Sequence, residues 1–306
     1  MKRFTLSFAA LGAAALAPLA SAHIASELPT GEAARAEAVR IAGQDDLDKA
    51  ALALCDPHPD RQAIDRLSDL ENRKVFDDLY FAGTKNVSSW IWRSKTGYVI
   101  IDTLDDEKEA QEHIVASLDR FKIDRGAVKL IVITHGHRDH SGGAAYLKSI
   151  LPNARLAMTR EAQEVAVEGA RRLGASFPTV DIVLRDGMHI ADDLRVFETP
   201  GHSPGTVSLI FPLHAGNRHY MAGLLGGSAS YSLSASDKAA YSRSAHRFGD
   251  LAARSNVDII LSNHPVLDQT RTWLESGVLP PRAAARTPAE VRTYYRIVDL
   301  CARSHM

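Results

Sequence analysis

The feature that most constrains this chain is a cluster of metal-binding side-chain types in residues 131–143, Ile-Val-Ile-Thr-His-Gly-His-Arg-Asp-His-Ser-Gly-Gly. The run Val128–Ile133 is mostly β-branched and apolar, which predicts a buried strand. The turn after it carries His135, His137, Asp139 and His140, and a helix is expected to continue from Ser141 through Ile150. Such turns bring side chains together at one edge of a sheet. Imidazole and carboxylate are zinc ligands, so this H-x-H-x-D-H spacing predicts a metal site.

Two later segments add one histidine each. Residues 199–205 read Thr-Pro-Gly-His-Ser-Pro-Gly and contain His202, and residues 261–265 read Leu-Ser-Asn-His-Pro and contain His264. In this order, the three segments resemble the metal loops of the metallo-β-lactamase-fold hydrolases. The resemblance covers about residues 75–275.

The resemblance implies an α+β fold, a four-layer αββα sandwich, and a site for two zinc ions per chain. It assigns His135, His137 and His202 to the first zinc, and Asp139, His140 and His264 to the second. Three protein ligands leave each zinc an open position for water, as in catalytic sites. A metal-bound hydroxide would attack the substrate, and Asp139 would orient it as the catalytic carboxylate. Asp102, at the end of the strand Tyr98–Asp102, is expected to support a ligating histidine from behind, since such rings need a partner for the other nitrogen.

The segment after the strand Arg218–Leu225 separates the subfamilies. Many lactonases and glyoxalase-type thioesterases have a bridging aspartate there, and the first metallo-β-lactamase subclass has a ligating cysteine. Here residues 221–228 read Met-Ala-Gly-Leu-Leu-Gly-Gly-Ser, which offers only Ser228. The ligand set therefore resembles the third metallo-β-lactamase subclass, and Ser228 is expected to lie beside the second zinc and contact the substrate without binding metal.

The function that this resemblance implies is opening of the β-lactam amide of antibiotics by an exported zinc enzyme. The alternative is a zinc-dependent lactonase of the acyl-homoserine lactone type, or another exported hydrolase of cyclic esters or amides. A metal-binding protein without activity is a further alternative. A di-iron redox protein would need more carboxylate ligands and a flavin partner domain, and neither is visible.

The N-terminus has the pattern of a bacterial signal peptide. Lys2 and Arg3 precede the apolar run Phe4–Leu19, and Ala20-Ser21-Ala22 is a cleavage signal, so the mature chain is expected to begin at His23 in the periplasm or outside the cell. Cys55 and Cys301 could pair in that oxidising compartment, or remain two buried thiols.

The domain prediction is a signal peptide at 1–22, an N-terminal helical extension at 23–74 and the hydrolase domain at 75–306. Within them, we expect helices over Arg61–Glu71 and over Asp237–Arg254, the latter capped by Ser236. Formal net charge is −1, from 36 basic and 37 acidic residues. This balance gives no support for nucleic acid or an anionic membrane as partner, so a small-molecule substrate is expected.

Overall fold

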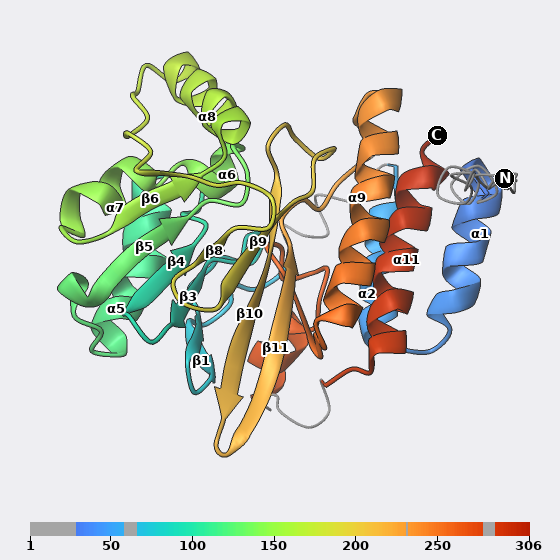
Figure 1. Ribbon diagram of the computed structural model, residues 1–306, viewed down its shortest axis with the longest axis horizontal. Coiled ribbons are helices and arrows are strands. Elements are labelled where there is room, and N and C mark those ends of the chain that lie inside the picture. The colour runs from blue at the N-terminus through green and yellow to red at the C-terminus, as the bar shows by residue number, and fades with distance from the viewer. Residues whose placement is uncertain (1–28, 58–65, 231, 278–284) are drawn as a thin grey trace, which may run out of the picture.

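Two β-sheets lie face to face at the centre of the molecule, and helices cover both outer faces (Figure 1). The computed structural model describes residues 29–57, 66–230, 232–277 and 285–306. The expected signal peptide at 1–22 and the start of the mature chain at His23 therefore lie outside the described residues. The predicted αββα architecture is confirmed.

The first sheet has seven strands in the order β1 to β7. Their bounds are β1 Arg73–Phe76, β2 Leu79–Phe81, β3 Trp90–Arg93, β4 Tyr98–Ile101, β5 Val128–Val132, β6 Arg155–Met158 and β7 Ile182–Val183. Strands β1 to β4 form an antiparallel meander, and β4 to β7 run parallel. The carboxyl ends of β4 and β5 therefore meet at one edge of the sheet.

The second sheet has five strands in the order β12-β11-β10-β9-β8. Their bounds are β8 His189–Ile190, β9 Leu194–Glu198, β10 Val207–Ala215, β11 Arg218–Leu225 and β12 Ile259–Ser262. Only β11 and β12 pair in parallel; the other pairs are antiparallel.

Helices form the outer layers. Those beside the first sheet are α4 Glu107–Glu109, the π-helix η3 Ala110–Val115, α5 Ala116–Arg120, α6 Arg138–Ser141, α7 Ala144–Ile150 and α8 Arg160–Arg172. Those beside the second are α9 Ala235–Arg254 and α11 Pro288–Ser304, which pack on each other. The remaining elements are α1 Gly31–Ala42, α2 Asp46–Ala51, α10 Thr270–Ser276 and the 3₁₀ turns η2 Leu52–Cys55 and η4 Arg125–Ala127.

Three hydrophobic clusters separate these four layers. Because successive strand residues face opposite sides of a sheet, β3 sends Trp90 and Trp92 between the sheets and Ile91 toward the helices. In the second sheet, Leu209 and Phe211 of β10 meet the inter-sheet cluster, while Ile210 packs under α9 and α11. The sandwich thus holds the loops at the sheet edges on a rigid core.

The described part of the N-terminal extension packs on the helical layer beside the second sheet. Its apolar residues, including Ala34, Ala38 and Leu54, share one cluster with α9 and α11, and Figure 1 shows α1 beside α11. Cys55 and Cys301 form a disulfide bond between the extension and α11, which decides the question that their sequence positions left open. Among the described residues, no helix is both long and apolar enough to cross a bilayer.

Several local expectations differ from the structure. The part of Arg61–Glu71 that is described, from Arg66 onward, contains no helix. There Leu70 is buried between the sheets and the Ser68 carbonyl accepts a hydrogen bond from Arg271, so tertiary contacts override helix propensity. Helix α9 begins at Ala235 and is capped by Ser234, not Ser236, because the Ser234 hydroxyl accepts the Asp237 amide. Strand β1 and helix α10 were not expected.

Candidate metal centre

Three loops at one edge of the two sheets bring the six candidate ligands together. The loop after β5 carries four of them, and Asp139 and His140 lie within the short helix α6 that begins inside the motif. The loop between β9 and β10 carries His202, and the loop after β12 carries His264. Each loop follows a buried strand, so the sequence fixes the loop position through the burial of the strand before it.

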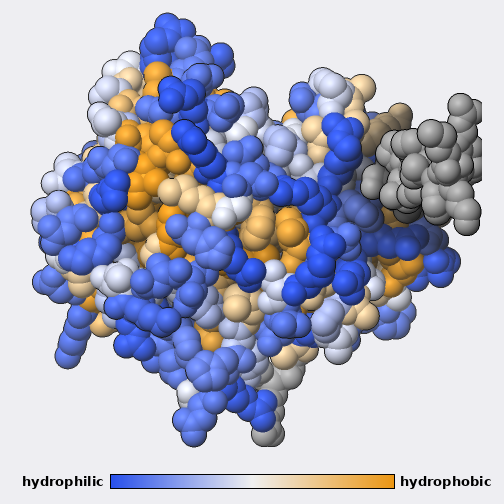
Figure 2. All heavy atoms as spheres, viewed as in Figure 1, coloured by the Kyte–Doolittle hydropathy of each residue, from blue (hydrophilic) through white to orange (hydrophobic). Residues whose placement is uncertain are grey.

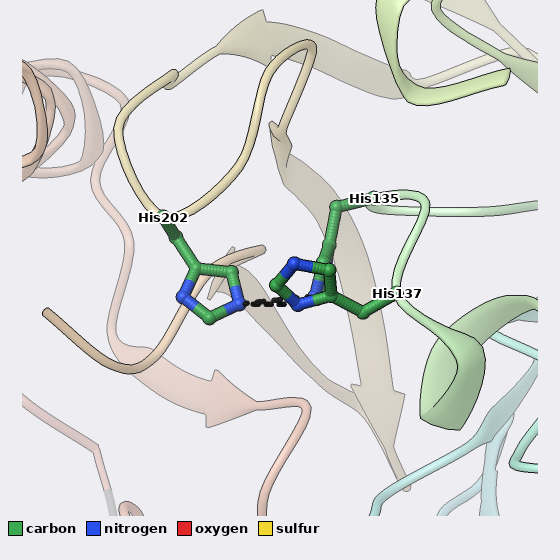
Figure 3. Close-up of side chains that lie close together, drawn as sticks. All are labelled: His135, His137 and His202. Carbon is green, nitrogen blue, oxygen red and sulfur yellow. Dashed lines mark hydrogen bonds between the residues drawn. The ribbon is translucent and has the colours of Figure 1, made fainter. Parts of the chain in front are cut away.

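His135, His137 and His202 form the first group that could hold a metal ion, and their rings point toward one another (Figure 3). The Nε2 atom of His202 lies 3.2 Å from Nε2 of His135 and 3.1 Å from Nδ1 of His137. His135 is fully buried, and the other two are partly exposed. The first group is therefore reachable from solvent on one side.

Asp139, His140 and His264 form the second group that could hold a metal ion. The Asp139 Oδ2 atom lies 3.1 Å from Nε2 of His140 and 3.9 Å from Nε2 of His264. The side chain of Asp139 is 37% exposed and that of His264 is 24% exposed, whereas that of His140 is 1% exposed. Asp139 thus lies at the open rim of the site.

In His202 and His264, the ring nitrogen that faces away from the group has a carbonyl oxygen as acceptor. His202 Nδ1 lies 2.8 Å from the carbonyl of Ala229, and His264 Nδ1 lies 2.7 Å from the carbonyl of Asn86. An N–H on these atoms leaves Nε2 as a lone pair directed into the group. The Ala229 amide also lies 3.3 Å from Nδ1 of His202. This contact is longer than the one to the Ala229 carbonyl, and it does not fit a tautomer with the proton on Nδ1.

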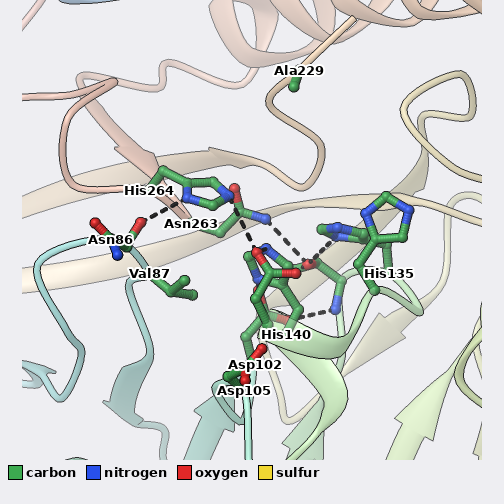
Figure 4. A network of polar contacts seen from close by, with 12 residues as sticks. Asn86, Val87, Asp102, Asp105, His135, His140, Ala229, Asn263 and His264 are labelled. Atoms are coloured by element: carbon green, nitrogen blue, oxygen red, sulfur yellow. Dashed lines mark hydrogen bonds and ion pairs between the residues drawn. The ribbon is translucent and has the colours of Figure 1, made fainter. Parts of the chain in front are cut away.

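His140 has the same arrangement with a charged partner (Figure 4). Its Nδ1 lies 2.9 Å from Oδ2 of Asp102, and its buried Nε2 faces the Asp139 carboxylate at 3.1 Å. Asp102 is fully buried, follows β4 and has a φ of 62°, in the left-handed region that aspartate tolerates better than most residues. The structure therefore brings Asp102 to a candidate ligand, as expected from the sequence.

The donor set fits a divalent metal. In a tetrahedral site with metal–nitrogen distances of about 2.0–2.1 Å, two ligand nitrogens are about 3.3–3.4 Å apart. The first group has 3.1 and 3.2 Å between its nitrogens, which is close to that spacing. A cation would bind the nitrogens of the first group, and in the second group it would bind Nε2 of His140 beside the Asp139 carboxylate.

Burial and neighbouring charges lower the pKa of three candidate ligand histidines, two in the first group and one in the second. Burial, together with the charge of neighbouring histidines, lowers the pKa of His135 well below its ordinary value and lowers that of His202 to about 3. Burial and His140 lower the pKa of His264 to about 4. These rings are neutral near pH 7, the form in which imidazole binds metal.

His140 behaves differently. Burial lowers its pKa, but the carboxylates of Asp139 and Asp102 outweigh burial and raise the pKa to about 10. Burial likewise opposes the charge of Asp139, but His140, His264 and His137 hold its pKa well below its usual range. A metal beside Nε2 of His140 would replace this proton, since metals bind the deprotonated ring.

Ser228 is buried, and the structure gives no contact between it and either group. Its neighbours contact the first group: an ideal Cβ on Gly227 would lie 2.4 Å from the Cβ of His202, and the Ala229 carbonyl faces the same ring. The loop therefore packs against His202. Binding of substrate by Ser228 stays a prediction.

Sequence reasoning missed the residues that hold the rings from behind. Asn86 and Ala229 act through backbone carbonyls, which no side-chain pattern reveals. Thr134 contacts His135 and Asp102 through its hydroxyl, and its place directly before the motif could have suggested such a role.

An apolar cavity of about 260 Å³ lies behind the metal loop, between α7 and α8. Its wall includes Gly136, Arg138, Tyr146 and Leu173 but none of the six candidate ligands. Figure 2 shows hydrophobic side chains gathered on this face below α8. The cavity therefore lies outside the candidate metal centre.

Comparison with known proteins gives one consistent family. Residues 82–215 match the metallo-beta-lactamase superfamily. Among solved structures, the chain resembles the FEZ-1 metallo-beta-lactamase from Legionella gormanii, with a TM-score of 0.61 and 21% identity over 73% of this chain and 90% of that one. It also resembles BJP-1, a subclass B3 metallo-beta-lactamase of Bradyrhizobium japonicum, with a TM-score of 0.60 and 21% identity over 74% of this chain and 90% of that one.

A curated relative is similar over a shorter stretch. Glyoxylase B2 of Dictyostelium discoideum is 39% identical over 88 residues, which span 26% of this chain and 30% of that protein. The family match, the four-layer fold and the two candidate metal groups agree with one another. Residues 82–215 therefore match the metallo-beta-lactamase superfamily, and the chain has the fold of the solved metallo-beta-lactamases.

Proposed function

We propose that the chain is an exported dinuclear zinc hydrolase that opens the β-lactam amide of antibiotics. The observation that carries the proposal is the pair of three-ligand groups side by side at one sheet edge, each with at least one solvent-accessible member. The ligand types favour zinc, because five imidazoles and one carboxylate suit it better than magnesium or calcium, which prefer oxygen.

In this proposal His135, His137 and His202 hold one zinc, and Asp139, His140 and His264 hold the other. Zinc would supply a water of lowered pKa and polarise the scissile carbonyl of the substrate. The chain's own residues do the positioning. Asp102 and the carbonyls of Asn86 and Ala229 fix the ring orientations before substrate arrives, which avoids reorganisation during the reaction.

Asp139 has a second role in the proposal. Its Oδ2 lies 3.1 Å from His140, while the exposed part of the carboxylate faces the open rim of the site. A carboxylate with a strongly lowered pKa remains ionised and can accept a hydrogen bond from the attacking water. Asp139 would therefore orient the nucleophile toward the carbonyl carbon.

Two observations favour a β-lactam as substrate. The chain resembles solved metallo-beta-lactamase structures, and the similarity covers most of the length of those proteins. Residues 221–228 contain no acidic side chain that could bridge two metals. In this account Ser228 donates a hydrogen bond to the substrate carboxylate, which β-lactam antibiotics carry and neutral lactones lack.

A zinc-dependent lactonase, or another exported hydrolase of cyclic esters or amides, is the second candidate. The 88-residue similarity to Glyoxylase B2 supports it, because that relative shows that this part of the sequence is not restricted to proteins named lactamases. The metal groups would serve either reaction.

Export is part of the proposal. The disulfide between Cys55 and Cys301 requires an oxidising compartment, since such bonds are rare in the reducing cytosol. A cleaved signal peptide at residues 1–22 would deliver the chain to the periplasm or outside the cell.

The test is one purified, zinc-loaded preparation assayed in parallel against a β-lactam panel and a lactone panel. We expect hydrolysis of at least one β-lactam with kcat/KM above that for any lactone. The matched control is Asp139→Asn, which should lose both activities. Lactone opening with no β-lactam hydrolysis would replace the first candidate by the second, and no hydrolysis of either panel would contradict both.

A further inference from the structure

One oxygen of the Asp102 carboxylate contacts both His140 of the second group and Thr134, the residue before His135 of the first group. Oδ2 of Asp102 lies 2.9 Å from Nδ1 of His140 and 2.9 Å from the hydroxyl of Thr134. Oδ1 of the same carboxylate accepts the Thr134 amide at 2.8 Å. Asp102, Thr134 and His140 are all fully buried, so water does not compete for these bonds.

The hydroxyl of Thr134 has one proton, and its neighbours decide where the proton goes. The hydroxyl donates this proton to Oδ2 of Asp102, 2.9 Å away. The hydroxyl oxygen then has two lone pairs left. It lies 3.1 Å from Nδ1 of His135 and 3.4 Å from Nδ2 of Asn263, an amide group that only donates.

His135 must therefore donate its Nδ1–H to Thr134, because the only proton of the hydroxyl is already used. Its Nε2 is left as a lone pair, 3.2 Å from Nε2 of His202 in the first group. His140 donates its Nδ1–H to Asp102 and presents Nε2 to Asp139 in the second group. One chain of hydrogen bonds thus fixes one ligand atom in each group (Figure 4).

We propose that Thr134 is a positioning residue that couples the two metal sites, by linking His135 of the first group to the Asp102 carboxylate that holds His140 of the second. The proposal rests on the metal centre of the proposed function and not on its substrate. Loss of the Thr134 hydroxyl leaves His135 without an acceptor and removes one of the two donors from Asp102 Oδ2, so both groups change together.

The simplest alternative is that Thr134 has only a structural role, as a small β-branched residue that follows a strand and fills space. Valine has the same shape and would serve that role equally well. The two roles therefore predict different zinc affinities for two variants. Thr134→Val keeps the volume and removes the hydroxyl, whereas Thr134→Ser keeps the hydroxyl and removes a methyl group.

The experiment is a titration of the metal-free chain with Zn²⁺ against a chromophoric chelator, which resolves the two binding steps without any substrate. In Thr134→Val we expect the affinity of one step to fall about 10- to 100-fold, as for loss of a partner behind a ligating histidine. The zinc affinity of the other step should fall about fivefold or more, which is the lower end of the range for coupling between two sites. Thr134→Ser should restore both steps to within about threefold of wild type.

The matched control is Thr199→Val. Thr199 is also buried, and its hydroxyl pairs with Ser208 and contacts none of the six candidate ligands. It reports the general effect of exchanging a buried hydroxyl for a methyl group, and both binding steps should keep wild-type affinity. Unchanged affinity in Thr134→Val, or weakening of one step alone, would overturn the coupling.

A second measurement needs no variant and stands if Thr134→Val does not fold. Nitrogen-15 NMR of labelled histidine in the zinc-loaded wild-type chain reports which ring nitrogen carries the proton. We expect His135 and His140 both to carry it on Nδ1, and a proton on Nε2 of His135 would overturn the proposal. If the wild type binds no metal, the proposed function fails, but the tautomer of His135 in the metal-free chain still tests the link to Thr134.

Discussion

The hydroxyl of Tyr241 lies 2.8 Å from the carbonyl oxygen of Gly227 and donates a hydrogen bond to it. Tyr241 is on α9, and Gly227 is in the loop that packs against His202. A second residue of α9, Ser244, donates to the carbonyl of Pro200 at 2.7 Å. Helix α9 thus holds both loops around His202, which explains how a ligand from a surface loop keeps a fixed position.

This support predicts the effect of Gly227→Ala. The new Cβ would lie 2.4 Å from the Cβ of His202, so the loop or the ring must move. We expect the affinity of the three-histidine site for zinc to fall about 10-fold or more, measured by chelator competition. The control is Gly169→Ala in α8, where nothing lies within 4 Å of the added atom. It should keep zinc affinity and raise the free energy of unfolding by about 0.5–1 kcal/mol. Wild-type zinc affinity in Gly227→Ala would show that the ring does not depend on this contact.

Asp139→Asn tests the role of the carboxylate at the rim. The amide keeps the shape but removes the charge that, in the proposed function, binds the second metal and orients the water. Steady-state kinetics on the best substrate should show kcat lower by about 100-fold or more. The thermal midpoint should change little, because Asp139 is 37% exposed. Near-normal turnover with both metals retained would remove this role from Asp139.

Ser228→Ala tests the proposed contact with the substrate carboxylate. Loss of one hydrogen bond, about 1 kcal/mol, should raise KM for a carboxylate-bearing β-lactam a few fold. Zinc content and hydrolysis of a neutral ester should stay at wild-type values. If the variant instead loses a metal, Ser228 is a ligand and the assignment of six ligands is incomplete.

Asp48 in the N-terminal extension gives a pH dependence remote from the metals. Burial and the nearby charge of Asp45 raise its pKa from 3.8 to about 6, against the opposing charge of Arg286. The folded chain therefore holds this proton more tightly than the unfolded chain, so the associated stability is present below pH 3.8 and is lost as pH rises through about 6.

Asp48→Asn cannot ionise and avoids that loss. Urea unfolding should find the variant more stable than wild type at pH 8, by about 1 kcal/mol after screening by solvent, and equal to it at pH 4. A variant that is less stable at pH 8 would show that the charged form makes a favourable contact.

The sequence predicted the two groups of candidate metal ligands that the structure brings together, because the chemistry and spacing of most of these residues are local. The motif from His135 to His140 lies in one turn, and the buried strand before it is visible as a run of β-branched residues. The layers followed from the resemblance, and the alternation of Trp90 and Ile91 between two clusters agrees with them.

The features that were missed depend on contacts between distant segments. The stretch after Arg66 has helix-forming residues, but burial of Leu70 and the bond from Arg271 hold it in another conformation. The carbonyls of Asn86 and Ala229 support histidines that are far away in the sequence, and any residue type could supply them. The neighbours of Ser228 contact His202, and the expected position of Ser228 beside the second metal stays a prediction.

The most direct test of the account is the number of zinc ions that the native chain binds, measured by mass spectrometry under native conditions after loading with excess zinc. Two groups of three ligands predict two zinc ions per chain. At most one ion per chain, with zinc still in excess, would contradict the dinuclear centre on which the proposed function and the role of Thr134 both depend.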